Sequence, residues 1–155
     1  MLLGFYRHTV DAKGRVAVPA AFRRELAQGS IVTIGAEGRL VIRPVAEWEQ
    51  LQQQFRLTSD TPPDERRFIR YLFANARELE LDAQGRLLLT PEQREFASIT
   101  DRAVFVGLGN VVELVGEATW EQEMHSFGPD QFTTLNDTIQ QHSTPDHGGY
   151  AAQQT

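Results

Sequence analysis

The sequence predicts a mixed α+β fold, mainly β, in which one structural unit occurs twice in tandem. Three observations support this prediction: a repeat spaced by 71 to 72 residues, the same Asp-containing turn motif in each copy, and an amphipathic helix pattern at the end of each copy. The chain has 155 residues, 41% of them hydrophobic, and is long enough to bury a core in one or two small domains.

The repeat is clearest around a short polar turn. Residues 10–18, with the sequence Val-Asp-Ala-Lys-Gly-Arg-Val-Ala-Val, match residues 81–89, Leu-Asp-Ala-Gln-Gly-Arg-Leu-Leu-Leu. Arg23 matches Arg94 at the same spacing. After one inserted residue, two aromatic pairs continue the match: Trp48 with Trp120, and Phe55 with Phe127. These matches indicate a duplication, because chance similarities do not keep their order along a chain.

The first copy, residues 1–55, is expected to alternate short strands with short helices. Asp11-Ala12-Lys13-Gly14 fits a three-residue hairpin turn, in which Asp favours the first position and Gly takes the left-handed one. The elements expected in chain order are a strand at 5–10, a strand from 15, a helix at 20–27, a hairpin of 30–34 with 39–43, and an amphipathic helix carrying Trp48, Leu51 and Phe55.

The second copy, residues 75–128, repeats this order. Its first helix has a complete start signal, because Thr90 can cap the helix, Pro91 suits the first turn and Gln93 completes a capping box. The expected elements are strands at 77–81 and from 86, a helix at 91–97, a hairpin of 103–106 with 111–115, and a helix carrying Trp120, Met124 and Phe127. The aromatic residues of both final helices are expected to belong to the core.

Two further segments complete the predicted organisation. The linker 56–74 contains helix-start signals and an apolar stripe that could pack the two units together or against another chain; its residues are Phe68, Ile69, Leu72 and Phe73. Segment 129–155 is rich in Gln, Thr, Asp, His, Gly and Pro and has few apolar residues, so it is expected to be a polar, mostly disordered tail.

The charged residues are distributed unevenly. The net charge of −6 excludes a uniformly basic nucleic-acid coat, yet residues 1–77 hold 12 basic and 8 acidic side chains, whereas 78–155 hold 3 and 13. Fourteen of the 15 basic residues are arginine, and Lys13 is the single lysine. Arginine forms bidentate contacts with phosphate or guanine and equally with carboxylates. Charge alone therefore permits either a binding face in the first half or a solvated surface.

The Asp-x-x-x-Arg pair is the most informative local motif. In a tight turn, Asp11 ends one strand and Arg15 begins the next, so the carboxylate can orient the guanidinium while other donors stay available to a ligand. The alternative is a surface ion pair worth about 0 to 1 kcal/mol. The same pair recurs as Asp82 and Arg86, with Arg23, Arg24 and Arg94 one helical segment downstream, and this recurrence makes the two interpretations about equally strong.

The residues give little support to catalysis. The four histidines, His8, His125, His142 and His147, lack metal-ligand spacing, and there is no cysteine. Neither a nucleophile elbow nor a complete dinucleotide-binding loop is found, since Gly107-Leu108-Gly109 fits a hairpin turn. We therefore expect no enzyme, no cofactor, no metal and no small-molecule substrate. Without a signal peptide or membrane-span pattern, the protein is expected in the cytoplasm.

Residues 10–26 resemble the looped-hinge, swapped-hairpin motif of AbrB-like transcription factors. Two tandem copies, each with Asp-x-x-Gly-Arg in its turn and a Trp-containing helix, are similar to the MraZ family of bacterial regulators over about residues 1–127. This resemblance implies a pseudo-twofold β-barrel and a ring-shaped homo-oligomer. It also implies binding to short direct repeats in double-stranded promoter DNA, usually with repression of its own promoter and the downstream division and cell-wall gene cluster, and association with the nucleoid.

The resemblance assigns the DNA-facing role to arginines of the turn motifs. The DNA-binding candidates are Arg15, Arg86, Lys13, Arg7, Arg23 and Arg24, and the positioning carboxylates are Asp11 and Asp82. Two positions depart from the family pattern: Leu3 replaces a common basic residue, and Gln84 stands where the first copy has Lys13. The second turn, amid acidic residues, is expected to make the weaker contact. The main alternative is an antitoxin-like DNA-binding protein that sequesters a toxin through its tail. The tail is expected to lack the amphipathic or aromatic anchors of a groove-binding segment, which counts against this alternative.

Overall fold

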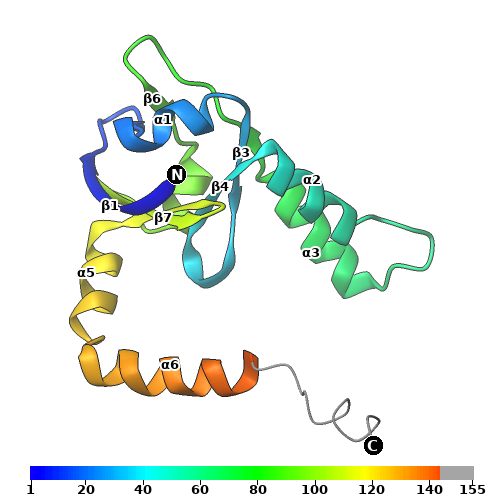
Figure 1. Ribbon diagram of the computed structural model, residues 1–155. Coiled ribbons are helices and arrows are strands. Elements are labelled where there is room, and N and C mark those ends of the chain that lie inside the picture. The colour runs from blue at the N-terminus through cyan, green and yellow to red at the C-terminus, as the bar shows by residue number, and fades with distance from the viewer. Residues whose placement is uncertain (144–155) are drawn as a thin grey trace, which may run out of the picture. The chain divides into compact units, whose positions relative to one another are not determined.

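The computed structural model describes residues 1–143 (Figure 1). The chain divides into two compact units, Met1–Trp120 and the segment that begins at Glu121. In the described part, no helix combines the length and the apolar character that crossing a membrane requires. The elements are β1 (Leu2–Thr9), β2 (Arg15–Ala17), α1 (Ala20–Leu26), β3 (Ser30–Ile34), the 3-10 turn η1 (Ala36–Gly38), β4 (Leu40–Pro44), α2 (Val45–Gln54), α3 (Pro63–Ala74), β5 (Arg77–Glu78), β6 (Arg86–Leu88), α4 (Pro91–Phe96), β7 (Arg102–Gly109), β8 (Val112–Gly116), α5 (Glu117–His125) and α6 (Pro129–Ser143).

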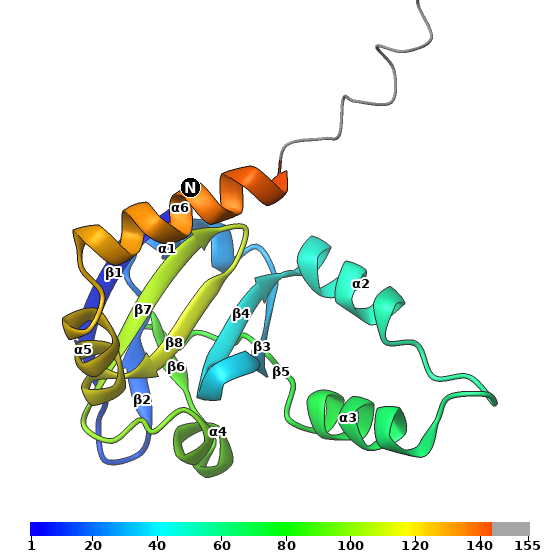
Figure 2. The same cartoon turned by 90° about the horizontal axis from the view of Figure 1, so that it is seen from below.

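The main sheet exchanges strands between the two repeats. Its order is β1-β7-β8-β4-β3-β5, and every neighbouring pair is antiparallel (Figure 2). The hairpin β3–β4 of the first repeat lies beside the hairpin β7–β8 of the second. The first strand of each repeat pairs with the hairpin of the other repeat, β1 with β7 and β5 with β3. Each repeat therefore depends on the other to complete its part of the sheet.

A second, two-stranded sheet joins the repeats again. In it β2 pairs with β6, and Val16 lies opposite Leu87. The turn that precedes each of these strands has the predicted local form, since the N–H of Asp11 donates to the carbonyl of Arg15 and the N–H of Asp82 to that of Arg86, both at 3.0 Å. Apart from one bridge in each turn, however, the flanking strands separate and pair across the repeats instead of continuing as a local hairpin.

The mixed α+β class is confirmed, whereas the closed β-barrel is not. The strands of the described residues form two open antiparallel sheets of six and two strands. The physical reason lies at the edges of the larger sheet: β1 and β5 each have one hydrogen-bonded neighbour in it, and β5 is only two residues long. The predicted strand 77–81 accordingly shortens to Arg77–Glu78, with a single bridge at Leu81.

The core lies between the sheets and the short helices. Val16 and Leu87 of the small sheet and Phe22 of α1 are at most 4% exposed, together with Phe105 and Leu114 of the main sheet. The capping box predicted at Thr90 is present, because its hydroxyl accepts from the N–H of Gln93 and the Gln93 side chain accepts from the N–H of Thr90. This cap fixes the start of α4 directly after β6.

The linker forms the predicted helix α3, which packs against α2. Rings of the two helices meet in two pairs, Trp48 with Phe73 and Phe55 with Phe68, at centroid separations of 5.2 and 5.0 Å. On α3, Ile69 and Leu72 are buried. In the first repeat the apolar stripe of the linker therefore covers the closing helix. The predicted core role of that helix holds only in part, because Leu51 and Phe55 pack against the core but are partly buried.

The segment after residue 128 differs from its prediction. Residues 129–143 form the helix α6, so the expectation of disorder over 129–155 is wrong for this part; residues 144–155 lie outside the described part. Phe132, Leu135 and Ile139 recur at helical spacing and are about half exposed. This spacing outweighs the polar composition. The expected lack of apolar anchors is thus also wrong, and Met124 and Phe127 are more exposed than the predicted core role implies.

Candidate nucleic-acid interface

In the first Asp-x-x-x-Arg turn one carboxylate accepts three hydrogen bonds, two of them from the arginine. Asp11 Oδ1 accepts from the backbone N–H groups of Lys13 at 3.0 Å and Arg15 at 2.9 Å. Asp11 Oδ2 accepts from Arg15 Nε at 2.6 Å. The Nε bond orients the guanidinium, whose terminal nitrogens carry further N–H donors. This is the geometry that the motif predicts.

The second turn reproduces the first. Asp82 Oδ1 accepts from the N–H groups of Gln84 and Arg86, each at 2.9 Å. Asp82 Oδ2 accepts from Arg86 Nε at 2.8 Å. Both repeats therefore fold the motif in the same way, with Gln84 in the place of Lys13.

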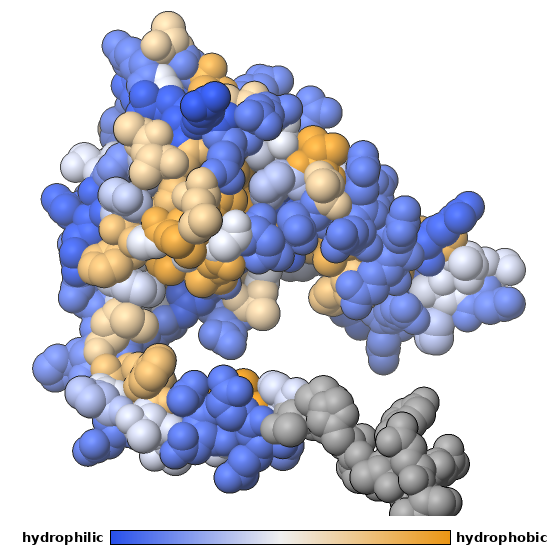
Figure 3. Space-filling model, in the orientation of Figure 1, coloured by the Kyte–Doolittle hydropathy of each residue, from blue (hydrophilic) through white to orange (hydrophobic). Residues whose placement is uncertain are grey.

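The pairing of β2 with β6 brings the two turns together. Arg86 Nη1 lies 3.7 Å from Asp11 Oδ2, so the arginine of the second repeat also faces the carboxylate of the first. Arg15 is 35% exposed at its side chain and Arg86 29%, which leaves both accessible from solvent. Figure 3 shows a mostly hydrophilic surface over the end of the molecule where α1 and the loop before β6 lie in Figure 1. We call Asp11, Arg15, Asp82 and Arg86 the paired-turn site.

Hydrogen bonds within the turns lower the pKa values of both carboxylates of the paired-turn site. The backbone N–H of Arg15 holds the pKa of Asp11 below its ordinary value, and the Arg15 guanidinium adds to this effect. The backbone N–H of Arg86 lowers the pKa of Asp82 in the same way. Near neutral pH each turn therefore presents a charged guanidinium on a charged carboxylate. An arginine held in this manner suits a planar or tetrahedral anion such as phosphate.

These lowered pKa values predict a weak acid sensitivity of the free protein. A depressed folded-state pKa contributes stability above the unfolded value, and that stability is lost as the pH falls through the folded value. We expect Asp11→Asn to flatten the fall in melting temperature below about pH 4, the unfolded range of aspartate. Thermal unfolding of wild type and variant at several pH values measures this. An identical acid dependence in both proteins would show that the turn contributes nothing.

The other DNA-binding candidates differ in their placement relative to the paired-turn site. Lys13 is exposed within the first turn, and Arg24 is exposed on α1. Arg7 is on β1, where it pairs with Glu117 at 3.6 Å and lies 5.2 Å from the centre of the Phe5 ring, so it is engaged elsewhere. Arg23 lies against the second turn, and its Nε is buried. Arg94 is not among the DNA-binding candidates, yet it lies beside the first turn as Arg23 lies beside the second. The 71-residue repeat, which matches Arg23 with Arg94, is the signal that points to it.

The site offers guanidinium groups and carboxylates and no metal-binding cluster. Within residues 1–143 no three His, Asp or Glu side chains come close enough to share a metal ion. What the arrangement can do chemically is hold anionic groups at two neighbouring points. A nucleic-acid backbone presents such groups at regular intervals.

Comparison with known proteins identifies the family. The family model described as "MraZ protein, putative antitoxin-like" matches twice, over residues 1–71 and 72–142. The chain belongs to the MraZ family. The two matches agree with the duplication predicted from the turn motifs, and the second one includes nearly all of α6. The family is a non-enzymatic one, as the lack of catalytic motifs led us to expect.

Relatives in other bacteria carry a regulatory name. A protein of Herpetosiphon aurantiacus called "Transcriptional regulator MraZ" is 40% identical over 127 residues, which are 82% of this chain and 89% of the relative. Proteins of the same name in Desulfitobacterium hafniense and Moorella thermoacetica are 42% and 39% identical, over 77% and 79% of this chain and 84% and 85% of their own lengths. The similarity therefore extends over most of the length of each of these relatives.

Proposed function

We propose that this protein is a sequence-specific DNA-binding transcriptional regulator that acts as a repressor. Its targets are its own promoter and the downstream division and cell-wall genes. The observation that carries the proposal is the paired-turn site: two equivalent turns, joined by β2 and β6, each present an oriented arginine. The relatives named as transcriptional regulators support it.

The proposed DNA contacts come from the turns and the adjacent basic residues. Arg15 and Arg86 face the DNA, with Asp11 and Asp82 as positioning carboxylates. Lys13 adds positive charge on the first turn, and Arg24 adds it on α1, next to the Arg23 that lies on the second turn. Arg7 is a more distant candidate, since it is paired with Glu117. The second turn has Gln84 where the first has Lys13, which favours a weaker contact by Arg86.

A ring-shaped homo-oligomer would reconcile this function with a net charge of −6. Affinity for DNA depends on the phosphates neutralised at the contact face, whereas total charge enters as a screened repulsion. A ring that repeats one paired-turn site could engage several short direct repeats at once, and the linked contacts would strengthen one another. Such a protein would associate with the nucleoid in the cytoplasm.

A footprint on the DNA upstream of the protein's own gene tests this function. We expect protection of short, evenly spaced repeats, and binding that weakens steeply between low and moderate salt. Each phosphate contact contributes about −0.9 to the slope of log K against log salt. Gel shifts at several salt concentrations measure the slope.

A scrambled duplex of equal length is the matched control for this experiment. Equal affinity for both duplexes would remove sequence specificity from the proposal. A flat salt response would contradict contacts dominated by phosphate.

A second candidate function is that of an antitoxin-like protein, and α6 favours it. Phe132, Leu135 and Ile139 form an apolar stripe of the kind that binds in a groove of another protein. A toxin gene beside this one, and co-purification of its product that is lost on Phe132→Asp, would support this function. A methyltransferase gene immediately downstream would favour the regulator.

A further inference from the structure

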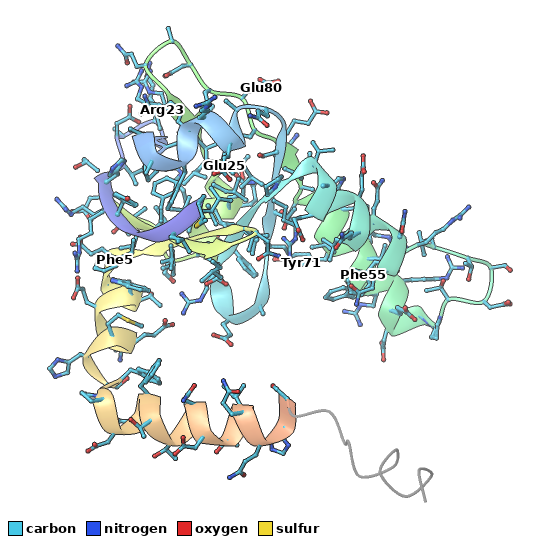
Figure 4. All side chains as sticks on the ribbon, viewed as in Figure 1. Phe5, Arg23, Glu25, Phe55, Tyr71 and Glu80 are labelled. Carbon is cyan, nitrogen blue, oxygen red and sulfur yellow. The ribbon has the colours of Figure 1, made fainter. Side chains whose placement is uncertain are left out.

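Two arginines at equivalent places in the repeats lie on the turns of the opposite repeats. Arg23 of α1 covers Gly85 in the second turn, where an added Cβ would lie 2.7 Å from both Nε and Cζ of Arg23. Arg94 of α4 covers Gly14 in the first turn, where a Cβ would lie 2.9 Å from Nε and 3.0 Å from Cζ. In Figure 4, Arg23 is labelled at the end of the molecule where α1 meets the loop before β6. Each guanidinium thus rests directly on a bare glycine.

The need for glycine at these positions goes beyond backbone conformation. Gly14 and Gly85 have φ angles of +89° and +74°, in the left-handed region. Asparagine also adopts this region, so conformation alone would permit a side chain. As the side chains lie, an added Cβ would also meet the guanidinium, and at Gly14 it would meet the backbone carbonyl oxygen of Leu89, 2.9 Å away. The glycine of the motif is therefore matched to an arginine of the other repeat.

Backbone hydrogen bonds follow the same crosswise pattern. The N–H of Val18 donates to the carbonyl of Gly85 at 3.0 Å, and the N–H of Leu89 donates to that of Gly14 at 2.9 Å. Arg23 Nη2 donates to the carbonyl of Val18 at 2.9 Å. Val18 thus links Arg23 to the turn that Arg23 covers. Each turn is held by strand and helix residues of the opposite repeat.

Burying the Nε atoms of these arginines destabilises the fold unless other contacts of the guanidinium compensate. The Nε atoms of Arg23 and Arg94 are both buried and have no hydrogen-bond partner within the described part of the chain. A buried donor without a partner destabilises the folded state. The same cost at two equivalent positions points to a role for the flat guanidinium itself, which packs face-on where a lysine ammonium would not.

We infer that Arg23 and Arg94 are positioning residues that act crosswise: Arg94 holds the first turn and so aims Arg15, and Arg23 holds the second turn and so aims Arg86. This inference rests on the proposed DNA-binding function and deepens it. It removes Arg23 from the set of DNA contacts. It also means that each repeat is required for the binding geometry of the other.

Double-mutant cycles on the full-length protein test the crosswise coupling. Arg94→Met keeps the aliphatic stem and removes the guanidinium, and Arg15→Lys and Arg86→Lys keep charge while losing the planar fork. We expect Arg94→Met to weaken binding to the upstream DNA about tenfold, with a larger coupling to Arg15→Lys than to Arg86→Lys. Arg23→Met should show the reverse pattern. Arg94→Lys replaces the methionine variant if that variant fails to fold.

Two outcomes of the cycles would overturn the inference. Stronger coupling of Arg94 to Arg86 than to Arg15 would place its action within its own repeat. Additivity with both lysine variants, together with a salt slope reduced by about 0.9, would make Arg94 a direct phosphate contact.

Amide hydrogen exchange of the free protein separates this inference from the function on which it rests. The N–H of Gly14 donates to Asp11 and that of Gly85 to Asp82. We expect Arg94→Met to speed exchange at Gly14 and not at Gly85, and Arg23→Met to do the opposite. Arg24→Met, which removes the same charge from the next position of α1, should change neither. If exchange changes in the crosswise pattern but the protein does not bind DNA, the positioning role stands and the proposed function fails. If exchange is unchanged and the protein binds DNA, the proposed function stands and the positioning role fails.

Discussion

Arg15→Ala is expected to abolish the complex with the upstream DNA at moderate salt, a loss of at least about 100-fold. An arginine that contacts DNA is worth about 1–3 kcal/mol, and a ring that repeats the site would multiply the loss across its subunits. Arg15 is the arginine whose Nε bond to Asp11 is shorter, 2.6 Å against 2.8 Å in the second turn, and its neighbour is Lys13 rather than Gln84. Gel shifts measure the loss.

Oligomer size should stay unchanged in this variant, because Arg15 is a partly exposed turn residue whose strand pairs within the chain. Gel filtration checks this. Arg67→Ala removes the same charge from an exposed position on α3 and serves as the matched control, with binding close to that of wild type. If Arg15→Ala shifted the DNA as wild type does, the paired-turn site would not be the DNA interface.

Local features of the fold were predictable, because nearby residues determine them. The turn at Asp11 and the capping box at Thr90 depend on residues within four positions, and the structure has both. The same holds for the strand Ser30–Ile34, whose predicted bounds are those observed. Short-range hydrogen bonds and preferred φ angles suffice to explain these elements.

The partners of the strands could not be predicted from local pattern. The turn suggests that β1 continues into β2 as a hairpin, yet β1 pairs with β7 along its whole length. This choice depends on matching two apolar strands about a hundred residues apart, which periodicity does not specify. The same limit applies to Arg23: its charge and its repeat position suggested a DNA contact, and only the fold brings it onto Gly85.

The error at the tail has a different cause. Composition favoured disorder after residue 128, but the spacing of Phe132, Leu135 and Ile139 carried a helical signal. A polar segment with few apolar residues still forms a helix when those residues share one face. Periodicity should therefore have outweighed composition there.

Gly116→Ala is expected to destabilise the protein by about 3 kcal/mol, the upper part of the range for overpacked sites. Gly116 ends β8 and is buried, and its N–H donates to the carbonyl of Ala97 at 3.0 Å. An added Cβ would lie 2.0 Å from the carbonyl oxygen of Ser98 and 2.8 Å from its carbon. Because both atoms belong to the backbone, relief requires the loop after α4 to move away from the sheet.

Thermal and urea unfolding of Gly116→Ala measure this loss, with Gly128→Ala as the control. At Gly128 a Cβ meets only the tip of the Gln131 side chain, at 3.2 Å, which can rotate away, so its melting temperature should stay near that of wild type. Since α4 carries Arg94, a displaced loop should also loosen the first turn and weaken DNA binding in the fraction that remains folded. A melting temperature equal to that of wild type would mean that the end of β8 does not rest on the α4 loop. The contact of Gly116 with the Ser98 backbone would then not hold β8 against the loop after α4.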